Sequence, residues 1–179
     1  MAALTAVEER FVLHWGEMGS VWGVSRTVAQ IFALLYLSPH PLTAEEISET
    51  LSLARSTVST GLRDLQSWDI IKTVQVLGDR RDHFEAIDDV WEVFRAILNG
   101  RKRREIDPTL AVLRQSVGEL EGSGEESAHV REKLEDMLGF FETVVKIYDQ
   151  VAEMPTGVLL RATELGDTFG KVLSILAKG

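Results

Sequence analysis

Residues 43–81 read T-A-E-E-I-S-E-T-L-S-L-A-R-S-T-V-S-T-G-L-R-D-L-Q-S-W-D-I-I-K-T-V-Q-V-L-G-D-R-R, and the fold follows from this stretch. Thr43 and Glu46 have the spacing of a capping box, in which each side chain satisfies a backbone N–H at the start of a helix. The pattern therefore predicts a short helix over about residues 44–51. Glu45 is read as one of several acidic side chains at helix starts, where they complement the helix dipole.

A second helix is predicted over about residues 53–67, with Ser52 as its cap. Val58, Leu62 and Leu65 recur at steps of four and three, so they share one inward face. The opposite face carries hydroxyls and arginines, namely Arg55, Ser56, Thr57, Ser59, Thr60 and Arg63. Such groups suit phosphate oxygens, and small side chains let a helix approach base edges. Two short helices with a tight turn are typical of helix-turn-helix DNA binding, and Thr43 is counted as a further candidate contact.

A β-hairpin is predicted directly after the second helix. Ile70–Leu77 is β-branched and apolar, G-D-R-R-D is a turn, and the four residues that follow can return as a strand. This arrangement places Arg80 and Arg81 at the tip of a wing, where arginine can enter a narrow minor groove of enhanced negative potential. Asp79 is expected to hold one of the two guanidinium groups through a charge-assisted hydrogen bond.

The segment A-R-S-T-V-S-T-G-L-R-D-L, followed by G-D-R-R-D, resembles the MarR superfamily of winged-helix repressors, and within it the GbsR-type regulators. The resemblance extends over roughly residues 5–120 and is strongest over residues 43–86. It implies a winged helix-turn-helix regulator that binds DNA. For GbsR-type proteins it also implies an association with choline or glycine betaine.

The charge of the chain is unevenly distributed. The net charge of −9 counts against DNA binding only if it is taken as a whole, because DNA affinity depends on local lysines and arginines. Basic side chains outside the helix and the wing tip are candidate contacts to the DNA backbone, namely Lys72, Arg101, Lys102, Arg103 and Arg104. The chain contains no cysteine and its first residues lack the pattern of a signal peptide, so we expect a cytoplasmic protein.

The fold class that follows is mainly α with a small β-hairpin wing. Residues 1–100 are expected to form the winged helix with an N-terminal helical extension, and residues 101–179 an α-helical dimerisation or sensing region. Residues 88–120 are either one kinked helix or two. Further on, apolar residues at steps of four and three predict two amphipathic helices that pair with each other, with residues 106–120 or with a second subunit. The candidate dimerisation residues are Phe141, Val144, Tyr148, Leu165, Phe169 and Val172.

The chain has four tryptophans, and Trp15 and Trp22 are spaced to share one face of a helix. One interpretation is packing in the core and interfaces. The other is an aromatic box that binds a quaternary ammonium effector through cation–π attraction.

The sequence does not predict an enzyme. It lacks the phosphate-binding loop, the nucleophile elbow and the zinc-protease helix motif, and its four histidines are scattered, so we expect no cofactor and no metal. The function predicted is a homodimeric, sequence-specific transcriptional regulator, most simply a repressor, that binds double-stranded DNA and responds to a small effector. The alternative is a winged helix that docks proteins in a larger assembly and has no sequence preference on DNA.

Overall fold

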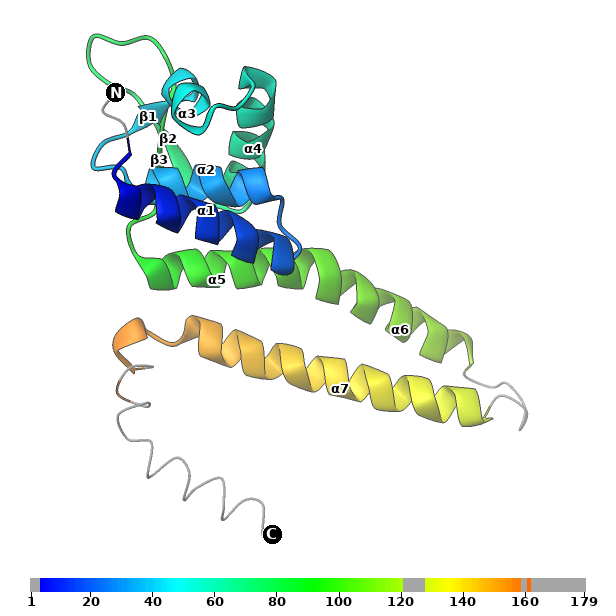
Figure 1. Ribbon diagram of the computed structural model, residues 1–179. Helices are drawn as coiled ribbons and strands as arrows, with labels where there is room; N and C mark the ends of the chain where they lie inside the picture. The colour runs from blue at the N-terminus through cyan, green and yellow to red at the C-terminus, as the bar shows by residue number, and fades with distance from the viewer. Residues whose placement is uncertain (1–3, 121–127, 159–160, 162–179) are drawn as a thin grey trace. The chain divides into compact units, whose positions relative to one another are not determined.

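The computed structural model describes residues 4–120, 128–158 and 161, and the fold is mainly helical with one small sheet (Figure 1). Contacts divide the chain into two compact units, residues 1–100 and 101–179. The predicted dimerisation residues Leu165, Phe169 and Val172 lie outside the described residues. No helix in the described ranges is both long and apolar enough to cross a membrane.

The first unit has the element order of a winged helix. Its elements are α1 (Ala6–Val21), α2 (Arg26–Leu37), β1 (Leu42–Thr43), α3 (Ala44–Leu51), α4 (Arg55–Ser67), β2 (Ile71–Val74), β3 (His83–Ala86) and α5 (Val90–Arg101). Helices α3 and α4 form the helix-turn-helix, and β2 and β3 are the strands of the wing. The predicted fold class is therefore confirmed.

The predicted capping box begins α3. The Glu46 N–H donates to Thr43 Oγ1 over 3.2 Å, and the Thr43 N–H donates to Glu46 Oε2 over 2.8 Å. The prediction that Ser52 caps α4 is wrong. Ser52 has φ 52° and closes α3 in the left-handed conformation, and Ala54 precedes the first turn of α4. The three residues 52–54 therefore make the tight turn, and α4 begins two residues later than predicted.

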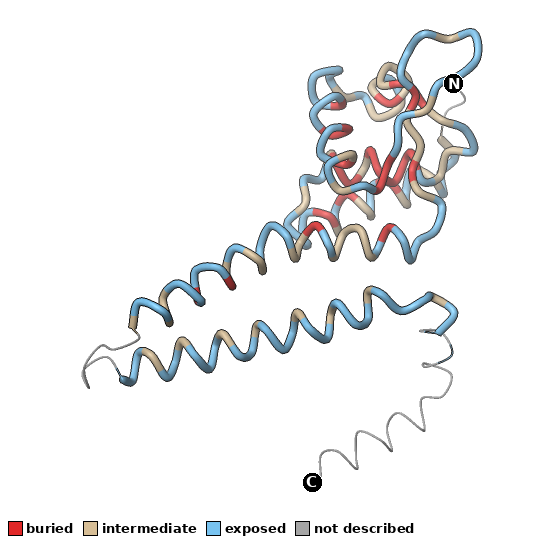
Figure 2. The backbone as a smooth tube through the Cα atoms, turned by 180° about the vertical axis from the view of Figure 1, so that it is seen from behind, coloured by how far each residue is buried: buried red, intermediate tan, exposed pale blue. Residues whose placement is uncertain are grey.

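Helix α2 lies at the centre of the first unit. Seven of its residues are buried, and it packs against both α1 and α4 (Figure 2). Glycines allow the close approach: a Cβ at Gly61 would lie 2.6 Å from Ile31 Cδ1, and a Cβ at Gly19 would lie 2.5 Å from the Cβ of Ala29. The buried stripe of α4 packs against α2, so the opposite face of α4 is the exposed one.

The sheet has the antiparallel order β1-β3-β2. In the wing hairpin Lys72 pairs with Glu85 in register, and β2 ends at Val74, three residues earlier than the predicted strand. Strand β1 was not predicted. It has only two residues, and it exists because Leu42 and Thr43 pair with Phe84 and His83, which are distant in the sequence.

The second unit contains η1 (Lys102–Ile106), α6 (Asp107–Glu119) and α7 (Ala128–Glu153). The backbone is helical from Val90 to Glu119, and a π-helical turn separates α5 from α6. Pro108 explains the wider turn. Proline cannot donate to the carbonyl four residues earlier, at Arg104, and its ring would crowd that carbonyl in a regular α-helix. Residues 88–120 therefore follow the first alternative, one helical run with a local irregularity.

Helices α6 and α7 pack against each other within the second unit. Leu110 and Leu113 of α6 are buried, and Arg114 Nη2 lies 2.9 Å from Glu142 Oε1. The contact leaves part of the apolar surface of α7 exposed.

The single apolar seam predicted for α7 divides into two neighbouring stripes. Phe141 and Tyr148 belong to a half-buried stripe, whereas Val144 is on an exposed one. We call the exposed residues of α7 at steps of three and four the α7 stripe, which consists of Met137, Phe140, Val144, Ile147 and Val151.

Candidate DNA-binding surface

The exposed face of α4 carries the side chains that the sequence predicted for it. Ser56, Thr60 and Arg63 lie opposite the buried stripe, because successive residues turn by about 100° around a helix. The exposed members of the predicted set are Arg55, Ser56, Thr57, Ser59, Thr60 and Arg63. The helix therefore presents hydroxyls and two guanidinium groups to the surroundings, with Asp64 at one margin.

Arg63 lies along the helix. Its Nη2 donates to Thr60 Oγ1 and its Nε donates to the carbonyl of Ser59, each over 3.3 Å. These contacts place a positive charge beside the hydroxyl of Thr60, on the side of α4 that faces away from the core.

A shallow hollow of about 360 Å³ lies beside this face. It is lined by Ser25, Thr27, Val28, Ser56, Thr57, Thr60, Gly61 and Asp64. Thr57 thus lies at the edge that α4 shares with the start of α2. Most of the lining side chains are hydroxyls, which donate and accept hydrogen bonds equally well.

The tip of the wing is held by Asp79. Arg81 donates from Nη2 to Asp79 Oδ2 over 2.5 Å and from Nε to Oδ1 over 3.0 Å, and its backbone N–H donates to Oδ1 over 3.0 Å. The prediction that Asp79 holds one guanidinium group is confirmed, and that group belongs to Arg81. The side-chain and backbone hydrogen bonds from Arg81 hold the pKa of Asp79 well below its usual range. Arg80 is exposed beside it.

A buried histidine, His83, contacts the residues of the wing tip. His83 begins β3, its Nδ1 lies 3.0 Å from the carbonyl oxygen of Arg81, and its Nε2 lies 3.6 Å from Asp79 Oδ2. The imidazole therefore contacts both residues of the wing-tip pair, which fixes the backbone of the wing where it returns to the sheet.

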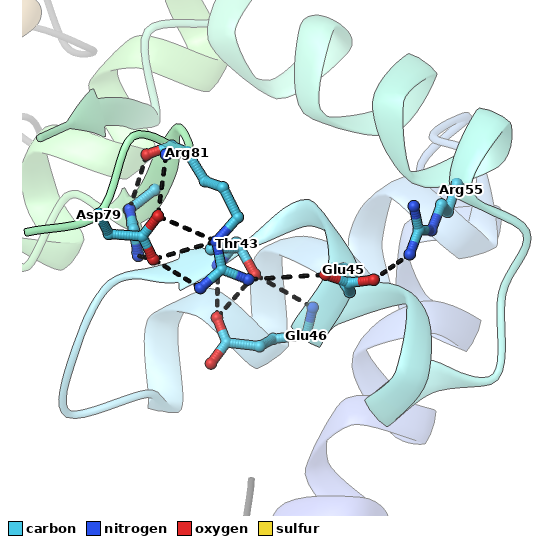
Figure 3. A network of polar contacts seen from close by, with 7 residues as sticks. Thr43, Glu45, Glu46, Arg55, Asp79 and Arg81 are labelled. Carbon is cyan, nitrogen blue, oxygen red and sulfur yellow. Dashed lines mark hydrogen bonds and ion pairs between the residues drawn. The ribbon is translucent and has the colours of Figure 1, made fainter. Parts of the chain in front are cut away.

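Glu45 joins the wing to the start of α4. Its carboxylate is ion-paired with Arg55, and its Oε2 lies 3.5 Å from Arg81 Nη1 (Figure 3). Sequence reasoning assigned Glu45 only a role in the helix dipole. The role of Glu45 becomes apparent only from its position in the folded structure. Arg81 lies 36 positions later in the sequence, so no local spacing connects the two residues.

One predicted DNA contact requires correction, and a second is ion-paired within the protein. Thr43 is 2% exposed, and its hydroxyl donates to Glu46 over 2.8 Å and accepts from the Glu46 N–H, so this side chain caps α3 and does not reach a ligand. Lys72 Nζ lies 2.8 Å from Glu85 Oε1, across the wing hairpin. This hydrogen bond raises the pKa of Lys72. The lysine side chain is 63% exposed, so Lys72 stays a candidate contact to the DNA backbone.

The basic run R-K-R-R lies where α5 meets the π-helical turn. Lys102 is only 25% exposed at its side chain, and its Nζ lies 3.4 Å from Asp107 and 3.8 Å from Asp149. Its charge therefore stabilises the second unit internally. Arg103 and Arg104 are exposed, and Arg101 is half-buried.

The two tryptophans of α1 contact each other directly. The rings of Trp15 and Trp22 meet edge to face with centroids 6.2 Å apart, and Trp15 also stacks on Phe11 at 5.5 Å. An aromatic box needs ring faces on several sides of a cation. Rings in mutual contact leave no space for a cation between them, so the geometry favours packing over the aromatic-box interpretation.

Comparisons with known proteins match the winged helix. The model of the MarR family matches residues 22–82, which include α2, the helix-turn-helix and most of the wing. This part of the chain is similar to the MarR family. The match begins four residues before α2 and ends one residue before β3.

Curated proteins similar to this chain are found at low sequence identity. The chain is 22% identical over 120 residues to the transcriptional repressor GbsR of Bacillus subtilis, covering 67% of this chain and 66% of the relative. It is 24% identical over 87 residues to the repressor OpcR of the same organism, covering 49% of this chain and 47% of the relative. The matched region thus spans about half to two thirds of the length of these relatives. The GbsR-like resemblance seen in the sequence is confirmed.

A solved crystal structure of a transcriptional regulator shares the fold with a TM-score of 0.60. It is 19% identical and covers 83% of this chain and 99% of that chain. The relatives that these comparisons name are transcriptional regulators and not enzymes.

Proposed function

We propose that the chain is a transcriptional regulator that binds double-stranded DNA in a sequence-specific manner. The observation that carries the proposal is the junction between α4 and the wing. The exposed hydroxyl and guanidinium face of α4 begins at Arg55, and Glu45 links this arginine to Arg81 at the wing tip. A helix suited to the major groove and an arginine suited to the neighbouring minor groove are thereby joined in one surface.

In this proposal Ser56, Thr60 and Arg63 contact base edges and nearby phosphates, while Arg80 and Arg81 contact the minor groove or the backbone. Thr57 and Ser59 lie at the margins of the exposed face. The exposed arginines of the R-K-R-R run, Arg103 and Arg104, are proposed as contacts to the DNA backbone only. The protein would carry out this role in the cytoplasm.

The regulator is proposed to act as a homodimer through the α7 stripe. Five apolar side chains at steps of three and four stay exposed after α6 has packed against α7. A soluble helix with such a stripe buries it against another helix. Two subunits would place their α4 helices in successive major grooves, so the operator would be an imperfect palindrome with half-sites about one helical turn apart.

Repression is the proposed outcome, because the relatives GbsR and OpcR are both named repressors. A small effector such as choline or betaine, which the resemblance implies, would act by binding one conformational state of the dimer more tightly than the other. Such an effector would bind elsewhere than between Trp15 and Trp22, because these two rings contact each other.

Fluorescence anisotropy tests the proposal. The full chain is titrated on the intergenic DNA upstream of its own gene and on a scrambled duplex across a salt series, then again with choline and with betaine. A preference of about a thousandfold for the intergenic DNA is the expected result. Equal, weak binding to both duplexes would instead support the protein-docking alternative. A search for a stable protein partner would then be the next experiment.

A further inference from the structure

We propose that Glu45 is a positioning residue that sets the guanidinium groups of Arg55 and Arg81 for DNA, and so couples the wing to α4. The inference rests on the proposed function and deepens it. Glu45 contacts no DNA in this scheme and acts through the two arginines.

The geometry assigns Glu45 a bridging position. Arg55 belongs to the first turn of α4 and Arg81 to the wing, and each contributes a guanidinium nitrogen to the same carboxylate (Figure 3). Asp79 holds Arg81 from the other side. The result is a continuous series of charges, alternating in sign, from α4 through α3 to the tip of the wing.

Without Glu45 the two arginines would be less ordered. Their side chains are 73% and 55% exposed, so neither is fixed by packing. Long exposed side chains lose rotamer freedom when they bind, and two neighbouring positive charges repel each other. A carboxylate between them removes both costs before DNA arrives, because it orders the guanidinium groups and offsets their repulsion.

The sign of the effect separates positioning from simple electrostatics. A carboxylate beside a DNA-binding surface repels phosphates, so its removal should strengthen binding if only net charge matters. Positioning predicts the opposite change on the operator, because the arginines lose the contact that holds them in place.

The test compares Glu45→Gln with Glu49→Gln. Both variants remove one negative charge from α3, and Glu49 lies one turn later, outside the contacts that join Arg55 and Arg81. We expect Glu45→Gln to weaken binding to the intergenic duplex by about fivefold, the order that one exposed ion pair contributes. Glu49→Gln should bind that duplex at least as tightly as the wild type, and both variants should bind the scrambled duplex at least as tightly.

A second readout excludes a merely structural role. In an Arg55→Gln/Arg81→Gln background the effect of Glu45→Gln should disappear, because the groups through which it acts are gone. Thermal melting checks the fold of each variant. If Glu45→Gln melts at a lower temperature than the wild type, the comparison is repeated with Glu45→Asp. This variant keeps the charge at the helix start but moves the carboxylate away from the two arginines.

The outcomes are distinguishable. Unchanged or tighter operator binding by a folded Glu45→Gln variant, while the wild type still prefers its operator, would overturn the inference alone. The same holds for a loss that persists in the double-arginine background. If the wild type itself shows no preference between the two duplexes, the proposed function fails and the inference fails with it.

Discussion

Arg81 Nη1 lies 3.5 Å from Glu45 Oε2, so the wing tip is ion-paired to α3, the first helix of the helix-turn-helix. The same carboxylate also pairs with Arg55, so one side chain links the wing tip to the start of α4.

Arg81→Ala should weaken binding to the operator and flatten its salt dependence. One lost phosphate contact lowers the slope of log K against log salt by about 0.9. Arg10→Ala, an exposed position on α1, removes the same charge outside the proposed surface and is the matched control. Anisotropy titrations at several salt concentrations measure both quantities. An affinity and slope equal to those of the control would remove the wing from the mechanism.

Thr60→Ala should lose about 1–3 kcal/mol of discrimination at one base pair, because its hydroxyl stands on the outer face of α4 beside Arg63. Competition binding against operators substituted at single positions measures this. Ser67→Ala, at the end of the same helix, should leave discrimination unchanged. A loss that is equal on all sequences would show that Thr60 contacts the DNA backbone.

Gly19→Ala should lower the free energy of unfolding. The added Cβ would lie 2.5 Å from the Cβ of Ala29, which has no flexible end that can move away, so α1 and α2 must separate. Overpacking costs about 1–3 kcal/mol, and the gain of about 1 kcal/mol in helix propensity offsets part of it.

Gly139→Ala is the matched control for this change. A Cβ at Gly139 meets no described atom within 4 Å, so only the gain in helix propensity applies and stability should rise. Chemical denaturation of both variants gives the comparison. Stabilisation by Gly19→Ala would contradict the close packing of α1 on α2.

Glu46→Gln should flatten the pH dependence of stability below neutral pH. The Thr43 N–H and hydroxyl, together with the charges of Arg81 and His83, lower the pKa of Glu46 in the folded state. A lowered folded pKa means that Glu46 stabilises the protein above its unfolded pKa of 4.5, and that this contribution is lost as the pH falls through the lower folded value.

Denaturation of the wild type and Glu46→Gln between about pH 7 and pH 3 measures the effect. The two should differ by about 1 kcal/mol at neutral pH, and the difference should shrink as the pH falls. Glu49→Gln, on the same helix outside the capping box, serves as the control. A difference that grows on acidification would contradict the assigned pKa shift.

Ile147→Glu should dissociate the proposed homodimer. Ile147 is 56% exposed within the α7 stripe, and a charge there would be buried without a partner on dimerisation. We expect a rise of roughly tenfold or more in the dimer dissociation constant, measured by analytical ultracentrifugation. Lys146→Glu makes a larger change of charge on the polar face of α7 and should have little effect. Equal weakening by both variants would indicate charge repulsion instead of loss of the apolar contact.

The features that could be predicted from the sequence are those whose signals are local. The spacing of Thr43 and Glu46 predicted the start of α3, and the steps between Val58, Leu62 and Leu65 predicted which face of α4 is exposed. The turn residues after β2 predicted the wing and its arginines. In each case the residues that interact are a few positions apart, so the backbone geometry of one helix or one turn relates spacing to structure.

The features that join distant parts of the chain could be found only in the folded protein. Strand β1 pairs residues separated by some 40 positions, and Glu45 meets both Arg55 and Arg81. The apolar pattern of α7 contained both stripes, but the packing of α6 decided which one is covered. Spacing along the chain specifies the face on which a side chain lies. It does not specify which distant group will occupy that face, because this depends on how the elements pack together.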